Sequence, residues 1–215
     1  MSALTITDDL FFNKAGLDRS RAERIVTDAL KGGDDGELFL EFNQSEALAY
    51  DDGKLKSASF DVTQGFGLRA VAGEAHAYAH ASDLSEPALQ RAAATVKAIH
   101  AGHSGTLAEP PIGTNRLLYS DDNPLSKLDF SAKVSLLQQI DAYARAKDPR
   151  VRQVMASISG NWQAVQIMRG DGTRAADIRP LVRLNVSIMV EENGRMETGS
   201  HGMGGRFTYD HVIDP

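Results

Sequence analysis

The amino-acid sequence predicts an α+β fold made of two blocks, each an antiparallel β-meander with packed helices. Two dipeptides, Asp52-Gly53 and Asn193-Gly194, stand beside segments of β type and are strong signals for two-residue hairpin turns. Over residues 182–190, valine, leucine or isoleucine occupies every second position, as in a strand with one packed face. Apolar residues at helical spacing precede each group of predicted strands.

The first block is expected to begin with a helix near residue 20. Ser20 and Glu23 have the spacing of a capping box, in which two side chains satisfy free amides at a helix start. Gly32-Gly33 ends the segment. Between these signals, apolar residues recur at helical spacing and form one stripe: Ala22, Ile25, Val26, Ala29 and Leu30.

A β-meander and a second helix complete the first block. A helix over about 85–100 follows the strands, with Pro87 in its first turn, where proline is tolerated. A turn is expected at Ala72-Gly73-Glu74. The predicted strands cover residues 37–43, 47–50, 55–63, 65–71 and 75–80.

A boundary between the blocks is expected in residues 101–115, which contain three glycines and two adjacent prolines without a hydrophobic period. We therefore expect an N-terminal α+β domain at 1–105, a linker at 106–129 and a central α+β domain at 130–215 that is truncated.

The second block is predicted to start with a helix over 131–147 and to continue as strands. The strands are 151–159, 162–168 and one around 182–190, with a turn at Gly160-Asn161. The chain then returns into the glycine-rich run 199–205, and a last strand is expected over about 206–212. No closing helix is expected after it.

Composition excludes several classes of protein. The 215 residues carry 23 Lys+Arg and 29 Asp+Glu, for a net charge of −6, which argues against a general binder of nucleic-acid backbone. Without cysteine, the chain has no disulfide scaffold, cysteine nucleophile or thiolate metal site. No apolar run approaches the ~20 residues that span a bilayer, so we expect no membrane association and a cytoplasmic location.

Two glycine motifs resemble nucleotide-binding loops only in spacing. Gly65–Ala70 matches G-x-G-x-x-A, but the segment alternates as a strand and does not open a helix. Gly199–Gly204 has the glycine spacing of a P-loop, but Gly205-Arg206 stands where lysine and serine or threonine are required. Neither segment is therefore interpreted as a phosphate site.

The histidines offer weak candidates for metal ligands. His76 and His80 share one face of a predicted strand but lie roughly 13 Å apart at ~3.3 Å per residue. We interpret them as part of a polar outer face opposite alanines. His201 and His211, near acidic residues, are the other conceivable set, without a fixed helical spacing.

Three groups of residues carry a family resemblance. They are Gln64–Ala70 with Gly73-Glu74 and Ala77–Ala79; Asp171–Thr173 with Ala175–Asp177 and Arg179–Leu184; and Gly202–Phe207 with Tyr209. In order and spacing they resemble the TldD/PmbA family of zinc metallopeptidases, also described as modulators of DNA gyrase. The resemblance runs from about residue 10 to 209 and is closer to the TldD branch.

The resemblance implies a peptidase whose zinc is held by a His-Glu-x-x-x-His helix and a C-terminal cysteine, with the glutamate as general base. This chain has neither motif. We therefore expect zinc in the full-length protein and none here, with no catalytic or metal-binding residue in these 215 residues and no hydrolysis by the chain alone.

The resemblance also implies partners. A PmbA/TldE-type subunit, or a second copy, is expected to enclose the active site, and the substrates are unstructured peptides. We expect the glycine run to lie near the peptide path, with Gly202, Gly204, Gly205 and Arg206 as candidate residues, because glycine permits close backbone approach. A hairpin arm without a substrate role is an equal alternative for this run.

Two other readings of the whole chain stay open. It could be a non-catalytic module that binds a partner or serves as a scaffold, or a small enzyme that uses His201, His211 and nearby acids.

Overall fold

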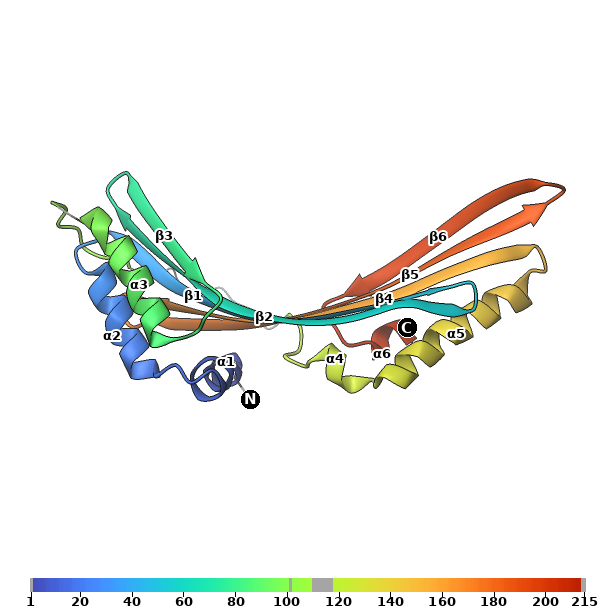
Figure 1. Ribbon diagram of the computed structural model, residues 1–215, viewed down its shortest axis with the longest axis horizontal. Helices are drawn as coiled ribbons and strands as arrows, with labels where there is room; N and C mark the ends of the chain where they lie inside the picture. Colours follow the sequence, from blue (N-terminus) through green and yellow to red (C-terminus); the bar gives the residue numbers. More distant parts are fainter. Residues whose placement is uncertain (1, 101, 110–117, 214–215) are drawn as a thin grey trace. The chain divides into compact units, whose positions relative to one another are not determined.

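The computed structural model describes residues 2–100, 102–109 and 118–213 and contains one six-stranded antiparallel sheet (Figure 1). Its strand order is β3-β2-β1-β4-β5-β6, so two consecutive meanders meet where β1 pairs with β4. The strands are β1 (Asp35–Asp51), β2 (Lys54–Ala72), β3 (Ala75–Ala81), β4 (Val151–Arg169), β5 (Arg174–Glu192) and β6 (Arg195–Gly205). The predicted α+β class is confirmed.

Helices precede, separate and follow the strands. They are α1 (Ala3–Asp8), the π-helical η1 (Asp9–Lys14), α2 (Arg19–Leu30), α3 (Glu86–Lys97), the 3₁₀ turn η2 (Ala98–His100), α4 (Pro124–Lys127), α5 (Phe130–Lys147) and α6 (Asp210–Ile213). None of these helices is long and apolar enough to cross a membrane.

The chain forms two compact units, and each draws on several separate segments. Unit 1 comprises Met1–Asn43, Thr63–Arg116 and Gln163–Ile178, and unit 2 comprises Gln44–Val62, Leu117–Trp162 and Arg179–Pro215. The spatial units therefore cut across the long strands, whereas the expected domains at 1–105 and 130–215 divide the chain along its sequence. Of the expected linker 106–129, residues 110–117 lie outside the described part, and α4 falls within the rest.

Unit 1 buries the apolar stripes that the sequence indicates. Helices α2 and α3 pack against each other and share a core with β1 and β2. Helix α3 begins where predicted, with the Ser85 side chain accepting a hydrogen bond from the Ala88 amide. Helix α2 begins at Arg19, and its cap is Asp18, which accepts from the Arg21 amide at 2.8 Å. The predicted capping box of Ser20 and Glu23 is therefore wrong, because a carboxylate two residues earlier takes the amide.

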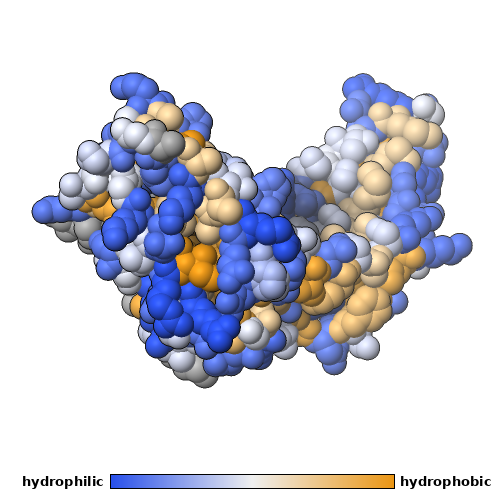
Figure 2. Space-filling view, turned by 60° about the vertical axis from the view of Figure 1, so that its left-hand side comes forward, coloured by the Kyte–Doolittle hydropathy of each residue, from blue (hydrophilic) through white to orange (hydrophobic). Residues whose placement is uncertain are grey.

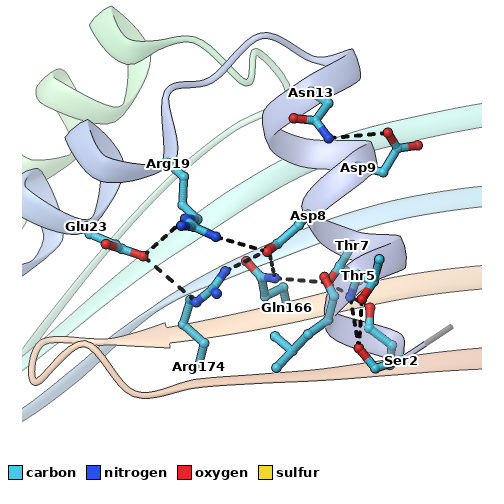
Figure 3. A network of polar contacts seen from close by, with 12 residues as sticks. Ser2, Thr5, Thr7, Asp8, Asp9, Asn13, Arg19, Glu23, Gln166 and Arg174 are labelled. Atoms are coloured by element: carbon cyan, nitrogen blue, oxygen red, sulfur yellow. Dashed lines mark hydrogen bonds and ion pairs between the residues drawn. The ribbon is translucent and has the colours of Figure 1, made fainter.

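The N-terminal helix α1, which the sequence did not indicate, is held in unit 1 by a polar network (Figure 3). Asp8 at its end accepts hydrogen bonds from Arg174 at 2.7 Å, Gln166 at 2.8 Å and Arg19 at 3.3 Å. The Gln166 amide also donates to the Thr7 hydroxyl, and both side chains are fully buried. Asp8 therefore joins α1 to α2, β4 and β5.

Unit 2 packs α5 against the sheet through Leu137, which lies in a core with Leu48, Ile158 and Val182. Two buried polar residues also lie on this helix, Lys133 and Asp141. The helix over 131–147 is therefore confirmed, with its packed face more polar than its apolar spacing suggests.

The two Xaa-Gly hairpins are confirmed. Asp52 and Asn193 have φ values of 48° and 53°, and the glycines that follow have φ values of 75° and 81°. Positive φ at both central positions is the requirement of a type I′ turn, which asparagine or aspartate followed by glycine satisfies best.

The predicted turn at Gly160-Asn161 is wrong, because β4 runs through both residues without a break. A side chain at Gly160 would overlap the Tyr209 hydroxyl and would come within 2.5 Å of a Leu125 methyl carbon. Glycine is needed here for close packing of a strand, and not for a reversal of the chain.

The predicted last strand over 206–212 is also wrong. The strand β6 ends at Gly205, and residues 210–213 form the short helix α6, so the second block does have a closing helical turn. The Val212 amide bonds to the Tyr209 carbonyl oxygen at 2.9 Å, and the Tyr209 ring is fully buried. The segment after β6 is therefore held by the buried Tyr209 side chain, and not by the strand pairing that the sequence suggested.

Candidate functional site

The glycine run 199–205 forms the second part of β6, the last strand of the sheet. Its residues pair antiparallel with β5, so that Gly202 lies opposite Asn185, Gly204 opposite Arg183 and Gly205 opposite Val182. Among the described strands none pairs with the outer edge of β6. A row of backbone donors and acceptors is therefore open to another extended chain along this edge.

The glycines of this strand have different packing. A Cβ at Gly204 would overlap the Val182 carbonyl oxygen, and a Cβ at Gly202 would lie 2.6 Å from the Asn185 side-chain oxygen. A Cβ at Gly199 would meet no atom within 4 Å. Gly204 is thus needed for the sheet itself, whereas Gly199 leaves open space.

A groove of about 500 Å³ lies over β5 and β6 at this open glycine. Its floor is the partly buried row Val186, Ile188 and Val190, which also packs against residues of α5 and β4. Gly199 lies opposite Ile188, while His201 and Glu197 lie opposite Val186 and Val190. The groove therefore combines an apolar floor with two ionisable side chains, on the face that carries α5.

A second groove of about 470 Å³ lies on the other face of the same strands. Arg183, Asn185 and Ser187 alternate with the packed residues of β5 and line this groove together with Met155 and Gly202. This groove therefore offers the polar groups of Arg183, Asn185 and Ser187 to a ligand beside apolar contact from residues such as Met155.

The remaining candidate, Arg206, follows β6 and is tied to unit 2. Its guanidinium donates to the Pro180 carbonyl oxygen at 3.4 Å and lies 5.4 Å from the Tyr119 ring centroid. Of the four candidates, Gly202 lines the second groove, while Gly202, Gly204 and Gly205 line a third, smaller groove along the β5–β6 pair.

Large apolar side chains also reach the surface, as the orange areas among blue ones in Figure 2 show. The most exposed of them are Phe60, Tyr78, Leu118, Phe130, Tyr143 and Met196. They belong to several elements of both units, so exposure by itself does not single out one site.

The histidine candidates do not come together as metal ligands. His76 and His80 stand on β3, where His80 stacks on Tyr78 with ring centroids 5.6 Å apart. His211 stacks on Phe207, with ring centroids 5.0 Å apart. No group of three histidine, aspartate or glutamate side chains that could hold a metal is found among the described residues.

A buried polar cluster in unit 2 was missed by sequence reasoning. The Lys133 ammonium lies 2.7 Å from the Glu46 carboxylate and donates to the Leu125 carbonyl oxygen at 2.8 Å. The Tyr209 hydroxyl donates to Glu46 at 2.9 Å. Burial, and then the Glu46 charge, raise the pKa of Tyr209 above its ordinary range. The available signal was a lysine four residues before Leu137, on the apolar stripe of α5.

The G-x-G-x-x-A segment lies inside β2, as the sequence reading expects. Gly67 is buried and pairs with His80 on β3. This segment therefore opens no helix whose N-terminus could bind a phosphate.

Two family models match most of the chain. The model of the PmbA/TldA metallopeptidase domain 1 matches residues 36–99, and that of the PmbA/TldA metallopeptidase central domain matches residues 123–214. The chain belongs to the TldD/PmbA metallopeptidase family. The resemblance read from the sequence is confirmed.

Curated relatives agree with this assignment. The metalloprotease TldD homologue of Haemophilus influenzae is 43% identical over 188 residues, which are 84% of this chain and 38% of that protein. The TldD homologue of Buchnera aphidicola from Schizaphis graminum is 34% identical over 181 residues, with the same coverage. The chain thus spans little more than a third of the TldD/PmbA relatives that it matches.

Solved structures share the fold of this TldD/PmbA chain at low identity. A modulator of DNA gyrase from Bacteroides thetaiotaomicron has a TM-score of 0.69 at 16% identity, covering 90% of this chain and 46% of that one. TldE from Thermococcus kodakarensis has a TM-score of 0.68 at 14% identity, covering 86% and 43%.

Proposed function

We propose that these residues are the N-terminal and central portion of a zinc-dependent peptidase of the TldD branch, which cleaves unstructured peptides in a cavity closed between subunits. The observation that carries the proposal is the 43% identity to a metalloprotease TldD homologue over 38% of its length. The described residues offer no zinc site, so the zinc ligands and the general base are assigned to the part of the protein outside this chain.

The part of the chain proposed to meet the peptide is the open edge of β6. An extended chain can add to a sheet edge through backbone hydrogen bonds, with little demand on sequence. Gly202, Gly204, Gly205 and Arg206 remain the proposed path residues, and Gly199 joins them because its surroundings are open. A PmbA/TldE-type subunit or a second copy is the proposed partner, and the cytoplasm is the proposed location.

The test compares this chain with the full-length protein. Both are purified with and without a TldE-type partner, and bound zinc and hydrolysis of an unstructured fluorogenic peptide are measured. We expect hydrolysis only from the full-length protein containing zinc, and none from the 215-residue chain. A zinc-loaded full-length protein that cleaves no unstructured peptide, alone or with the partner, would contradict the proposal.

The glycines of β6 differ in their value as test variants. Gly204→Ala would disturb the β5–β6 pairing itself, because its Cβ overlaps the Val182 carbonyl oxygen. Gly199→Ala changes the open edge without a clash and is the better probe of a peptide path. Slower cleavage by the full-length Gly199→Ala enzyme, with an unchanged melting temperature, is the expected result.

A further inference from the structure

Two strand glycines in this chain have opposite surroundings. Gly67 on β2 is covered by the Tyr78 ring from the neighbouring strand β3, so that a Cβ on Gly67 would lie 2.7 Å from the ring carbon Cε2. Tyr78 stands two residues from His80, the partner of Gly67, so the ring reaches the glycine diagonally. Gly199 on β6 has no such cover.

An aromatic ring placed over a strand glycine shelters the exposed backbone and contacts the side chains beyond it. At Gly67 the ring comes from the strand next to it in the sheet. At Gly199 no described strand lies beyond β6, so the sheet supplies no residue for this position. The apolar row behind the glycine, with Ile188 directly opposite, is left partly exposed.

We propose that the edge of β6 binds an extended peptide that places an aromatic side chain over Gly199, in contact with Val186, Ile188 and Val190. This inference rests on the proposed function, in which a peptide runs along β6. The substrate class selected by this edge is then an extended peptide with an aromatic side chain. Backbone pairing with β6 sets the register, and the groove of about 500 Å³ accommodates the ring.

The negative charge of Glu197 at the groove restricts the class of peptide further. Glu197 lies two residues from Gly199 and so shares its face, and its side chain is 60% exposed. Its ion pair with Arg195, itself 82% exposed, is open to water and contributes little free energy, so a basic side chain of the peptide can compete for the carboxylate. The edge therefore selects an aromatic residue with lysine or arginine two positions away, so that both side chains lie on one face of the added strand.

The test measures binding of two labelled peptides to the 215-residue chain by fluorescence anisotropy. One is fluorescein-Thr-Lys-Thr-Phe-Thr-Lys-Thr-amide, and the other has alanine in place of phenylalanine. The peptide carries a lysine on each side of the phenylalanine, so that one of them lies near Glu197 whether the peptide pairs parallel or antiparallel to β6. We expect the phenylalanine peptide to bind about tenfold more tightly, as burial of one aromatic side chain provides.

Three variants locate the effect. Gly199→Val puts a side chain into the open space, where a Cβ meets no atom within 4 Å, and valine suits a strand, so the preference for phenylalanine should disappear. Met196→Val is the control, because Met196 is 62% exposed and its side chain lies on the other face of β6, and the preference should persist. Glu197→Gln should weaken binding of both peptides severalfold.

Three results would overturn the inference. They are equal binding of the two peptides, a preference that survives Gly199→Val, and dimerisation of the chain that Gly199→Val abolishes, which would assign the edge to a second copy. The binding readout does not depend on hydrolysis. A full-length enzyme that cleaves both peptides, beside equal binding by the chain, would reject this inference and leave the proposed function in place.

Discussion

The Tyr209 hydroxyl donates a 2.9 Å hydrogen bond to the Glu46 carboxylate and thereby joins the segment after β6 to strand β1 within unit 2. The same carboxylate pairs with Lys133, whose ammonium also lies 5.4 Å from the centroid of the Tyr209 ring. One acidic side chain in β1 therefore holds both α5 and the C-terminal segment.

Tyr209→Phe should lower the free energy of unfolding by about 1.5–3 kcal/mol, because a buried hydrogen bond to a charged group is lost while the ring remains. Urea unfolding followed by circular dichroism measures the change. Tyr143→Phe is the control, since Tyr143 is 69% exposed, and it should shift stability by less than about 0.5 kcal/mol. Equal effects of the two variants would contradict a structural role for this hydrogen bond.

Lys133→Met should cost more, about 3–5 kcal/mol, because it leaves the Glu46 charge buried without its cation. The two side chains are only 4% and 9% exposed, so water cannot replace the lost partner. Adding Glu46→Gln to Lys133→Met removes the unpaired charge and should recover part of the stability. A double variant less stable than Lys133→Met would show that the charge is not the cause.

Gly160→Ala should destabilise unit 2 by about 1–3 kcal/mol, because the added methyl group overlaps the Tyr209 hydroxyl in a packed core. Gly199→Ala is the matched control in another strand, with no atom within 4 Å, and should change stability by less than about 0.5 kcal/mol. Thermal unfolding of both variants distinguishes a packing glycine from an open one. Unchanged stability of Gly160→Ala would refute the packing explanation for the missing turn.

Asp8→Ala should loosen α1 without unfolding unit 1, because it removes the acceptor shared by Arg174, Gln166 and Arg19. Faster amide hydrogen exchange confined to α1 is the expected result. Asp9→Ala is the control, since the Asp9 side chain bonds to Lys14 and Asn13 within its own segment. Equal acceleration in both variants would assign the effect to helix propensity alone.

Local signals in the sequence suffice to predict the two hairpins. Contacts between residues far apart in the chain could not be predicted from it. Asp52-Gly53 and Asn193-Gly194 specify their turns through their own backbone preferences, so sequence reasoning finds them. Gly160 is a glycine because of Tyr209, which lies 49 positions later in the chain, and no local pattern reveals such a contact.

The same limit applies to the candidate site. The family resemblance pointed to the glycine run, but the difference between Gly199 and Gly204 depends on what stands opposite each in β5. That register follows from the Asn193-Gly194 turn, and the clash at Gly204 follows from a backbone oxygen. The spacing of residues in the sequence predicts neither the short distance from a Gly204 Cβ to the Val182 carbonyl oxygen nor the open edge of β6.

Asp148→Asn should make the free energy of unfolding depend less on pH in the acid range. Hydrogen bonds from the Arg150 guanidinium, and then from the Arg150 amide, lower the pKa of Asp148 from 3.8 to about 2. A carboxyl group whose pKa is lower in the folded state stabilises the fold fully above its unfolded pKa, and this contribution is lost as pH falls towards 2. Asp148→Asn should therefore be less stable than the native chain at pH 7, and the difference should shrink between about pH 4 and 2. Urea midpoints at pH 7, 5, 4 and 3 measure this, and a difference that stays constant down to pH 3 would show that the ionised carboxylate is not the stabilising group.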